Sequence, residues 1–103
     1  MSSKTYAYLE NEVIIWARNR GIPQNSSPFA QALKTLEEAG ELLDAAHSGD
    51  KAAMADAYGD VLVTLLVGAE TAGMDLLECL SAAYSEIKDR KGYLRPDGVF
   101  VKE

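Results

Sequence analysis

The chain has 103 residues, of which 48% are hydrophobic and 25% are charged, as expected for a single globular domain rather than a disordered segment. Its formal net charge of −6 and pI near 4.7 exclude broad nucleic-acid binding, which needs a dominant basic surface. An acidic protein can still bind a polyanion when a divalent metal ion intervenes. The charge is therefore compatible with a phosphate-bearing substrate.

Cysteine usage and hydrophobicity indicate a cytoplasmic protein. Cys79 is the single cysteine, so no intramolecular disulfide can form, which is typical of a reducing compartment. No basic and apolar signal sequence begins the chain, and the strongest apolar run, residues 61–69, is far shorter than the roughly 20 residues of a membrane helix. We expect no membrane partner and no nucleic-acid partner.

Apolar residues at helical spacing predict the first two helices. The first covers residues 6–20 and stops at Gly21. A loop rich in Gly, Pro, Asn and Ser follows, after which Ser27 and Pro28 are typical of an N-cap and a first helical residue. The second helix ends at residues 47–49, and we expect its apolar face to pack against the next helix. That face consists of Phe29, Ala32, Leu33, Leu36, Ala39, Gly40, Leu43 and Ala46.

Two more helices and a short tail complete the predicted fold. Asp50 caps a third helix that runs to about Thr71, and Asp75 caps a fourth that runs to Gly92. The turn sequence at residues 96–98 then predicts a hairpin or extended arm. We expect one all-α domain over residues 1–103, a four-helix bundle in which residues 1–5 and 93–103 are flexible or arm-like.

Three glutamates form an acidic patch on the second predicted helix. Glu37, Glu38 and Glu41 have the i, i+3 and i, i+4 spacings that bring Glu41 beside both others. At about 100° per residue, this patch lies largely opposite the apolar face of the helix. Two interpretations stay open, a solvated surface and a site for a cation.

Asp60 in the third helix favours the cation site. An ionised carboxylate beside the apolar residues 61–67 is costly unless it is paired or bound to metal, and no Lys or Arg occurs between Lys51 and Lys88. A magnesium ion shared with the second helix would supply the charge, since Mg²⁺ prefers carboxylate, water and phosphate oxygens. The ion would also acidify a water whose proton one glutamate accepts. This arrangement suits phosphoanhydride hydrolysis.

Aromatic and basic residues supply further candidates for substrate binding. Trp16 and Tyr58 are suited to stacking on a nucleobase and equally suited to a core position. Lys34, one helical turn before the glutamates, is a surface ion-pair partner or a phosphate ligand. Three basic residues near the end of the fourth helix either complement the helix dipole or bind phosphate. They are Lys88, Arg90 and Lys91.

Two segments together resemble the paired helix motif of the MazG-like nucleoside triphosphate pyrophosphohydrolases. The segments are Lys34-x-x-Glu37-Glu38-x-Gly40-Glu41-Leu42 and Gly59-Asp60-Val61-Leu62. The short, phage-type members are similar in several further features. These are Trp16 before the first loop, Gln31 before Lys34, and the closing residues 88–92 and 98–103.

This resemblance implies an all-α enzyme, a dimer or dimer of dimers, that splits a nucleoside triphosphate into monophosphate and pyrophosphate with Mg²⁺, or with Mn²⁺ as an alternative ion. It assigns metal binding to Glu38, Glu41 and Asp60. It assigns metal binding or water activation to Glu37. The basic end of the fourth helix resembles a phosphate-binding segment.

One position departs from the family pattern. The second motif usually carries a glutamate three residues before the aspartate, where this chain has Ala57. Asp56 is the nearest acid and is a further candidate metal ligand in place of that glutamate, because it lies within about 40° of Asp60 around a helix. It is shorter than glutamate and differently placed, so the replacement is not equivalent. The alternative to an active enzyme is therefore a nucleotide-binding, metal-binding or dimerisation module with impaired catalysis.

Overall fold

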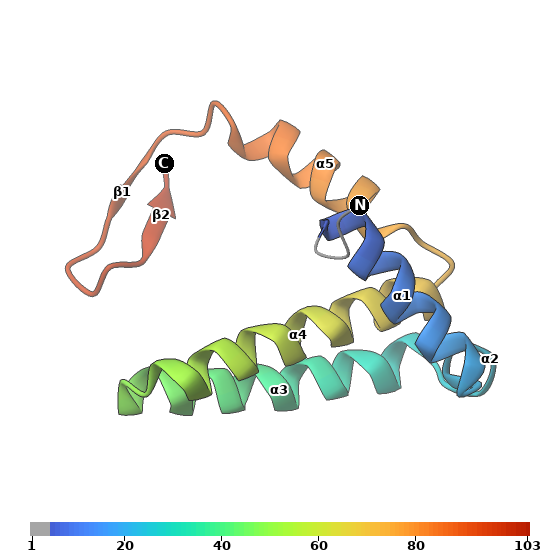
Figure 1. Cartoon of the computed structure of the whole chain (residues 1–103). Coiled ribbons are helices and arrows are strands. Elements are labelled where there is room, and N and C mark those ends of the chain that lie inside the picture. Colours follow the sequence, from blue (N-terminus) through green and yellow to red (C-terminus); the bar gives the residue numbers. More distant parts are fainter. Residues whose placement is uncertain (1–4) are drawn as a thin grey trace.

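The computed structural model describes residues 5–103, most of which are helical (Figure 1). Residues 1–4 of the expected flexible N-terminus lie outside the described part, and Thr5 caps the first helix. The all-α fold and the four long helices are confirmed. The elements are α1 (Tyr6–Asn19), α2 (Ile22–Asn25), α3 (Pro28–Ser48), α4 (Lys51–Thr71), α5 (Leu76–Ile87), β1 (Gly92–Leu94) and β2 (Phe100–Lys102).

Polar caps fix the starts of the long helices where the sequence predicts them. The side chains of Ser27, Asp50 and Asp75 each accept a hydrogen bond from a backbone N–H in the first turn of α3, α4 and α5, which satisfies a donor with no partner inside the helix. Gly49 ends α3 with a φ of 77°, a left-handed conformation that costs glycine little. The α3–α4 turn is therefore short.

Two local predictions are wrong. The Gly21–Ser27 segment contains the one-turn helix α2 instead of only a loop, because Pro23 suits a first helical turn and the Asn25 side chain donates to the Gly21 carbonyl at 2.8 Å. Helix α5 ends at Ile87, before Gly92. Residues 88–91 offer no apolar side chain to pack, and Gly92 pairs with Lys102 in the hairpin.

Helix α4 is the central element of the fold. It lies antiparallel beside α3 along most of its length, while α1 crosses its C-terminal half (Figure 1). The Thr35 and Thr64 hydroxyls join α3 to α4 at 2.8 Å, and Arg18 joins α1 to α4 through an ion pair with Glu70 at 2.6 Å. By length and composition alone α4 could cross a membrane, but here it is the helix that all other described helices contact.

Helix α3 turns its polar side, not its apolar side, toward α4. The expected packing of its apolar face within the chain is wrong, because Leu36 and Leu43 are 69% and 71% exposed. The six side chains toward α4 are partly buried, and five of them are small or polar. They are Gln31, Thr35, Glu38, Ala39, Leu42 and Ala45.

The C-terminal arm, residues 76–103, leads away from the α3–α4 pair (Figure 1). Within the described residues, α5 contacts only α4, and the antiparallel β1–β2 hairpin contacts no helix. The radius of gyration is 15.8 Å, against about 13 Å for a compact chain of this length. A single chain is therefore more extended than a self-contained domain.

Candidate metal and nucleotide site

Two turns of α3 bring together three carboxylates and a lysine that contacts two of them. One oxygen from each of Glu37, Glu38 and Glu41 lies within 4.8 Å of the others. The Lys34 ammonium lies 3.0 Å from a Glu37 oxygen and 3.6 Å from a Glu38 oxygen. The helical spacing of these residues is sufficient to produce this cluster.

The acidic cluster is not a simple solvated surface. The Glu38 side chain is only 13% exposed because it faces α4, whereas Glu37 and Glu41 are exposed. The pKa of Glu41 is raised above its usual value, mainly by the negative charge of Glu38 and then by desolvation and the charge of Glu37. The charge of Asp60 also raises this pKa, whereas the charge of Lys34 lowers it. The negative charges on α3 and α4 therefore act on one another.

The donor set fits a hard divalent cation. Oxygen ligands around one Mg²⁺ lie roughly 3–4 Å apart, as octahedral geometry at about 2.1 Å requires. The three carboxylates of α3 are close to that spacing, within 4.8 Å, and small rotamer changes would complete it. A cation would also remove the repulsion that raises the pKa of Glu41.

Helix α4 brings Asp60 to the same side as the cluster, although outside the 4.8 Å group. Asp60 is partly buried and Asp56 is exposed. Ala57, at the position of the expected family glutamate, is 6% exposed. A methyl group therefore occupies a buried position of α4 one turn before Asp60.

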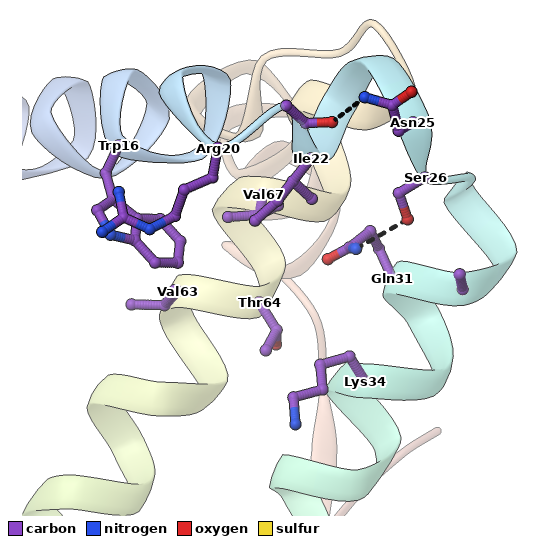
Figure 2. Close-up of a pocket in the computed structure, with 12 residues that line it drawn as sticks. Trp16, Arg20, Ile22, Asn25, Ser26, Gln31, Lys34, Val63, Thr64 and Val67 are labelled. Atoms are coloured by element: carbon purple, nitrogen blue, oxygen red, sulfur yellow. Dashed lines mark hydrogen bonds between the residues drawn. The ribbon is translucent and has the colours of Figure 1, made fainter.

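A cavity of about 620 Å³ adjoins the acidic cluster (Figure 2), within the range of about 300–1,000 Å³ of small-molecule sites. Lys34 links the two, because it lines the cavity and contacts Glu37 and Glu38. Trp16 lines the far side, with the Arg20 guanidinium 4.7 Å from the centroid of its ring. The cavity thus has an aromatic surface at Trp16 and is connected to the acidic cluster through Lys34.

The structure separates the predicted substrate-binding residues into two groups. Trp16 and Lys34 line the cavity, but Tyr58 is exposed and does not. The three basic residues predicted for the last turn of the fourth helix follow α5 instead, in an arm with no contact to α3. They are Lys88, Arg90 and Lys91.

Several lining residues have no functional role in the sequence-based predictions, although Gln31 belongs to the features that resemble the phage-type members. Gln31 precedes Glu38 by seven residues, so it lies on the same face of α3 two turns earlier. If Glu38 is known to face α4, this spacing predicts that Gln31 faces α4 as well. The others come from the end of α1, from α2, from the residue after α2 and from α4, and only the fold brings them together: Arg20, Asn25, Ser26 and Thr64.

The helices and the acidic cluster agree with one class of proteins, the all-α pyrophosphohydrolases. The chain belongs to the phosphoribosyl-ATP pyrophosphohydrolase family, whose sequence profile matches residues 11–86. The predicted MazG-like resemblance is confirmed by a solved structure described as a cyanophage S-2L MazG-like pyrophosphohydrolase bound to dGDP and three catalytic Mn²⁺ ions per active site. The similarity has a TM-score of 0.70 and 26% sequence identity, and it covers 96% of this chain and 93% of that chain. No curated protein matches the sequence.

Proposed function

We propose that this protein hydrolyses a (deoxy)nucleoside triphosphate to monophosphate and pyrophosphate with Mg²⁺, for which Mn²⁺ can substitute. The observation that carries this proposal is the cluster of Glu37, Glu38 and Glu41 within 4.8 Å beside a cavity of nucleotide size. Family membership supports hydrolysis of a pyrophosphate bond, and the similar phage protein supports a nucleotide ligand and divalent metal ions.

The charge and burial of the acids suggest different roles. Glu38, Glu41 and Asp60 would hold the ion, with Asp56 as a further acid. Bound Mg²⁺ supplies charge neutralisation for phosphate oxygens and acidifies water. The more exposed Glu37 accepts the water proton, the water oxygen bonds to phosphorus, and the bond that releases pyrophosphate breaks. No protein nucleophile is needed.

The cavity and the arm suggest where the rest of the substrate binds. The Trp16 ring provides a stacking surface for the base, and Lys34, held charged because its hydrogen bond to Glu37 raises its pKa, neutralises phosphate. The basic residues after α5 have no contact with α3 of their own chain. We therefore propose that they bind phosphate at the site of a neighbouring copy of the chain. These residues are Lys88, Arg90 and Lys91.

We further propose that the functional form is a homo-oligomer, a dimer or a dimer of dimers. The accessible surface is 7786 Å², whereas a folded monomer of 11.1 kDa exposes about 5,700 Å². The excess of roughly 2,000 Å² per chain is of the size that obligate dimers bury. The exposed α3 face around Leu36 and Leu43 suits a second copy. We place this oligomer in the cytoplasm, without a nucleic-acid or membrane partner.

A specific observation favours a second candidate function. Ala57 is buried where the family motif usually has a glutamate, so the site has one carboxylate fewer. The protein would then bind metal and nucleotide, or act as a helical dimerisation module, without efficient turnover.

One assay separates these functions. Purified protein is incubated with Mg²⁺ and each nucleoside triphosphate, each deoxynucleoside triphosphate and phosphoribosyl-ATP, and the products are resolved. We expect monophosphate and pyrophosphate from at least one triphosphate, with none after chelation of the metal. Diphosphate plus phosphate would contradict the proposed reaction. No turnover together with metal-dependent nucleotide binding would establish the second function.

A further inference from the structure

The first turns of α3 carry a polar side chain into the cavity from the side opposite Trp16. Gln31 is partly buried and lines the cavity between α3 and α4. The two helices approach each other closely at this point, as the distance from Gly68 of α4 shows. A Cβ atom added to Gly68 would lie 3.5 Å from the Gln31 Cβ. The backbone of Gln31 is therefore held near α4.

A hydrogen bond fixes how the Gln31 amide is presented. Its Nε2 donates to the Ser26 hydroxyl at 3.0 Å, which turns the amide nitrogen toward the loop before α3. Figure 2 shows the oxygen facing the space between Gln31 and Val67. Within residues 5–103, Gln31 Oε1 accepts no hydrogen bond, so it is available to a ligand.

The other uncharged polar side chains near this oxygen are already engaged. The Thr64 hydroxyl donates to the Val61 carbonyl at 2.7 Å and accepts from Thr35 at 2.8 Å. The Asn25 amide nitrogen donates to the Gly21 carbonyl, and Figure 2 shows the Asn25 oxygen turned away from the cavity. Among the uncharged lining groups that the structure describes, the Gln31 oxygen is thus the acceptor aimed into the cavity.

We propose that Gln31, positioned by Ser26, determines base specificity and selects nucleotides of adenine and cytosine, whose exocyclic amino groups lie at position 6 of the purine and position 4 of the pyrimidine. This amino group donates a hydrogen bond to Oε1 while the base packs between Trp16 and Val67. Guanine, thymine and uracil present a carbonyl oxygen at the corresponding position, which would repel the amide oxygen. This inference rests on the proposed function in taking a nucleotide as the ligand.

The single tryptophan provides a readout that does not need turnover. Trp16 is the only tryptophan of the chain and lines this cavity, so its fluorescence reports binding there. The full-length protein with Mg²⁺ is titrated with dAMP, dGMP, dCMP and dTMP, which share the sugar and phosphate. We expect dAMP to bind roughly three- to tenfold more tightly than dGMP, and dCMP to bind more tightly than dTMP by the same factor, the effect of one uncharged hydrogen bond.

Variants show whether Gln31 causes this preference. Gln31→Leu should bring the four dissociation constants within about twofold of one another, and Ser26→Ala should weaken the preference by freeing the amide. Gln24→Leu, an exposed glutamine of α2 outside the cavity lining, should keep it. Wild-type protein that binds dGMP as tightly as dAMP, or dTMP as tightly as dCMP, would overturn the inference. An unchanged preference in Gln31→Leu, or no binding by any of the four, would also overturn it.

The same measurements distinguish this inference from the proposed function. Base preference in binding without hydrolysis of any triphosphate would support the inference and contradict the proposed enzyme. Hydrolysis that treats all bases alike, in the wild type and in Gln31→Leu, would support the enzyme and overturn the inference.

Discussion

The two sides of α3 contrast in polarity and in burial. The side toward α4 carries the partly buried Glu38, only 13% exposed, with Gln31 and Thr35 on the same side. The opposite side carries Leu36 and Leu43, about 70% exposed. In a self-contained helical domain the apolar side would face the neighbouring helix of the chain.

From this contrast we infer that the two sides of α3 have different partners. In the proposed function the polar side forms a site with α4, where a cation would bind between the carboxylates. In the proposed homo-oligomer the apolar side contacts another chain, which would account for the extended shape of a single chain and its very few buried apolar residues. Each side can be tested separately by substitution.

The largest expected effect comes from the polar side. Glu38→Gln removes ligand charge with little change of volume, so Mg²⁺-dependent pyrophosphate release should fall by more than roughly 100-fold. Loss of a ligand should have a larger effect than changes to the partners of metal ligands, which reduce metal affinity or activity by about 10–100-fold. The thermal unfolding curve should change little. Glu86→Gln, an exposed acid of α5, is the matched control. Unchanged turnover in Glu38→Gln would refute the assignment of this residue.

On the apolar side, Leu36→Glu should separate the oligomer. Full burial of a leucine contributes about 1.5–3 kcal/mol, so association should weaken by roughly 10- to 100-fold or more, while the exposed position spares the fold of the single chain. Light scattering across a concentration series measures this. Gln24→Glu adds the same charge to an exposed position outside α3 and should leave the mass unchanged. A wild type that is monomeric at micromolar concentration would contradict the proposed interface.

Restoring the family glutamate at position 57 should strengthen the proposed metal site on the polar side of α3. Ala57→Glu adds a carboxylate one turn before Asp60 and should tighten Mg²⁺ binding and raise or create turnover by several-fold, measured by calorimetry and pyrophosphate release. Ala55→Glu, on an exposed position of α4, should do neither. Position 57 is only 6% exposed. If it were an ordinary core position without a metal ion nearby, the new glutamate would be a buried, unpaired charge and would destabilise the fold. Earlier melting even with Mg²⁺, without gained activity, would favour the non-enzymatic function.

The smallest expected effect is a pH dependence of the metal-free protein. Glu38 raises the pKa of Glu41 in the folded state, so the folded state binds more protons than the unfolded state, and the contribution of Glu41 to the unfolding free energy grows as pH falls. Glu41→Gln should therefore slightly raise the melting temperature with chelator at about pH 7 and reduce the gain on lowering the pH to about 5. A variant with the wild-type pH profile would show that the repulsion is negligible.

The sequence was sufficient for what local chemistry determines. Caps at Ser27, Asp50 and Asp75 and the helical period located the long helices, and the glutamate spacing located the acidic cluster. The sequence did not predict which side of α3 contacts α4. An apolar side indicates that it will be buried, but it does not indicate whether the burying surface belongs to the same chain or to another one. The cavity around Trp16 and Gln31 also escaped prediction, since its walls come from segments that only the fold brings together.

The most direct test of the central claim locates the metal. Crystals grown with Mn²⁺ and a nucleotide would show its position by anomalous scattering. We predict peaks bound by carboxylates of both helices, Glu38 and Glu41 from α3 and Asp60 from α4, at about 2.1–2.2 Å, close to the distances of hard divalent ions. A nucleotide in the cavity with no anomalous peak at these carboxylates, or with Glu38 and Asp60 turned away from one another, would contradict the account.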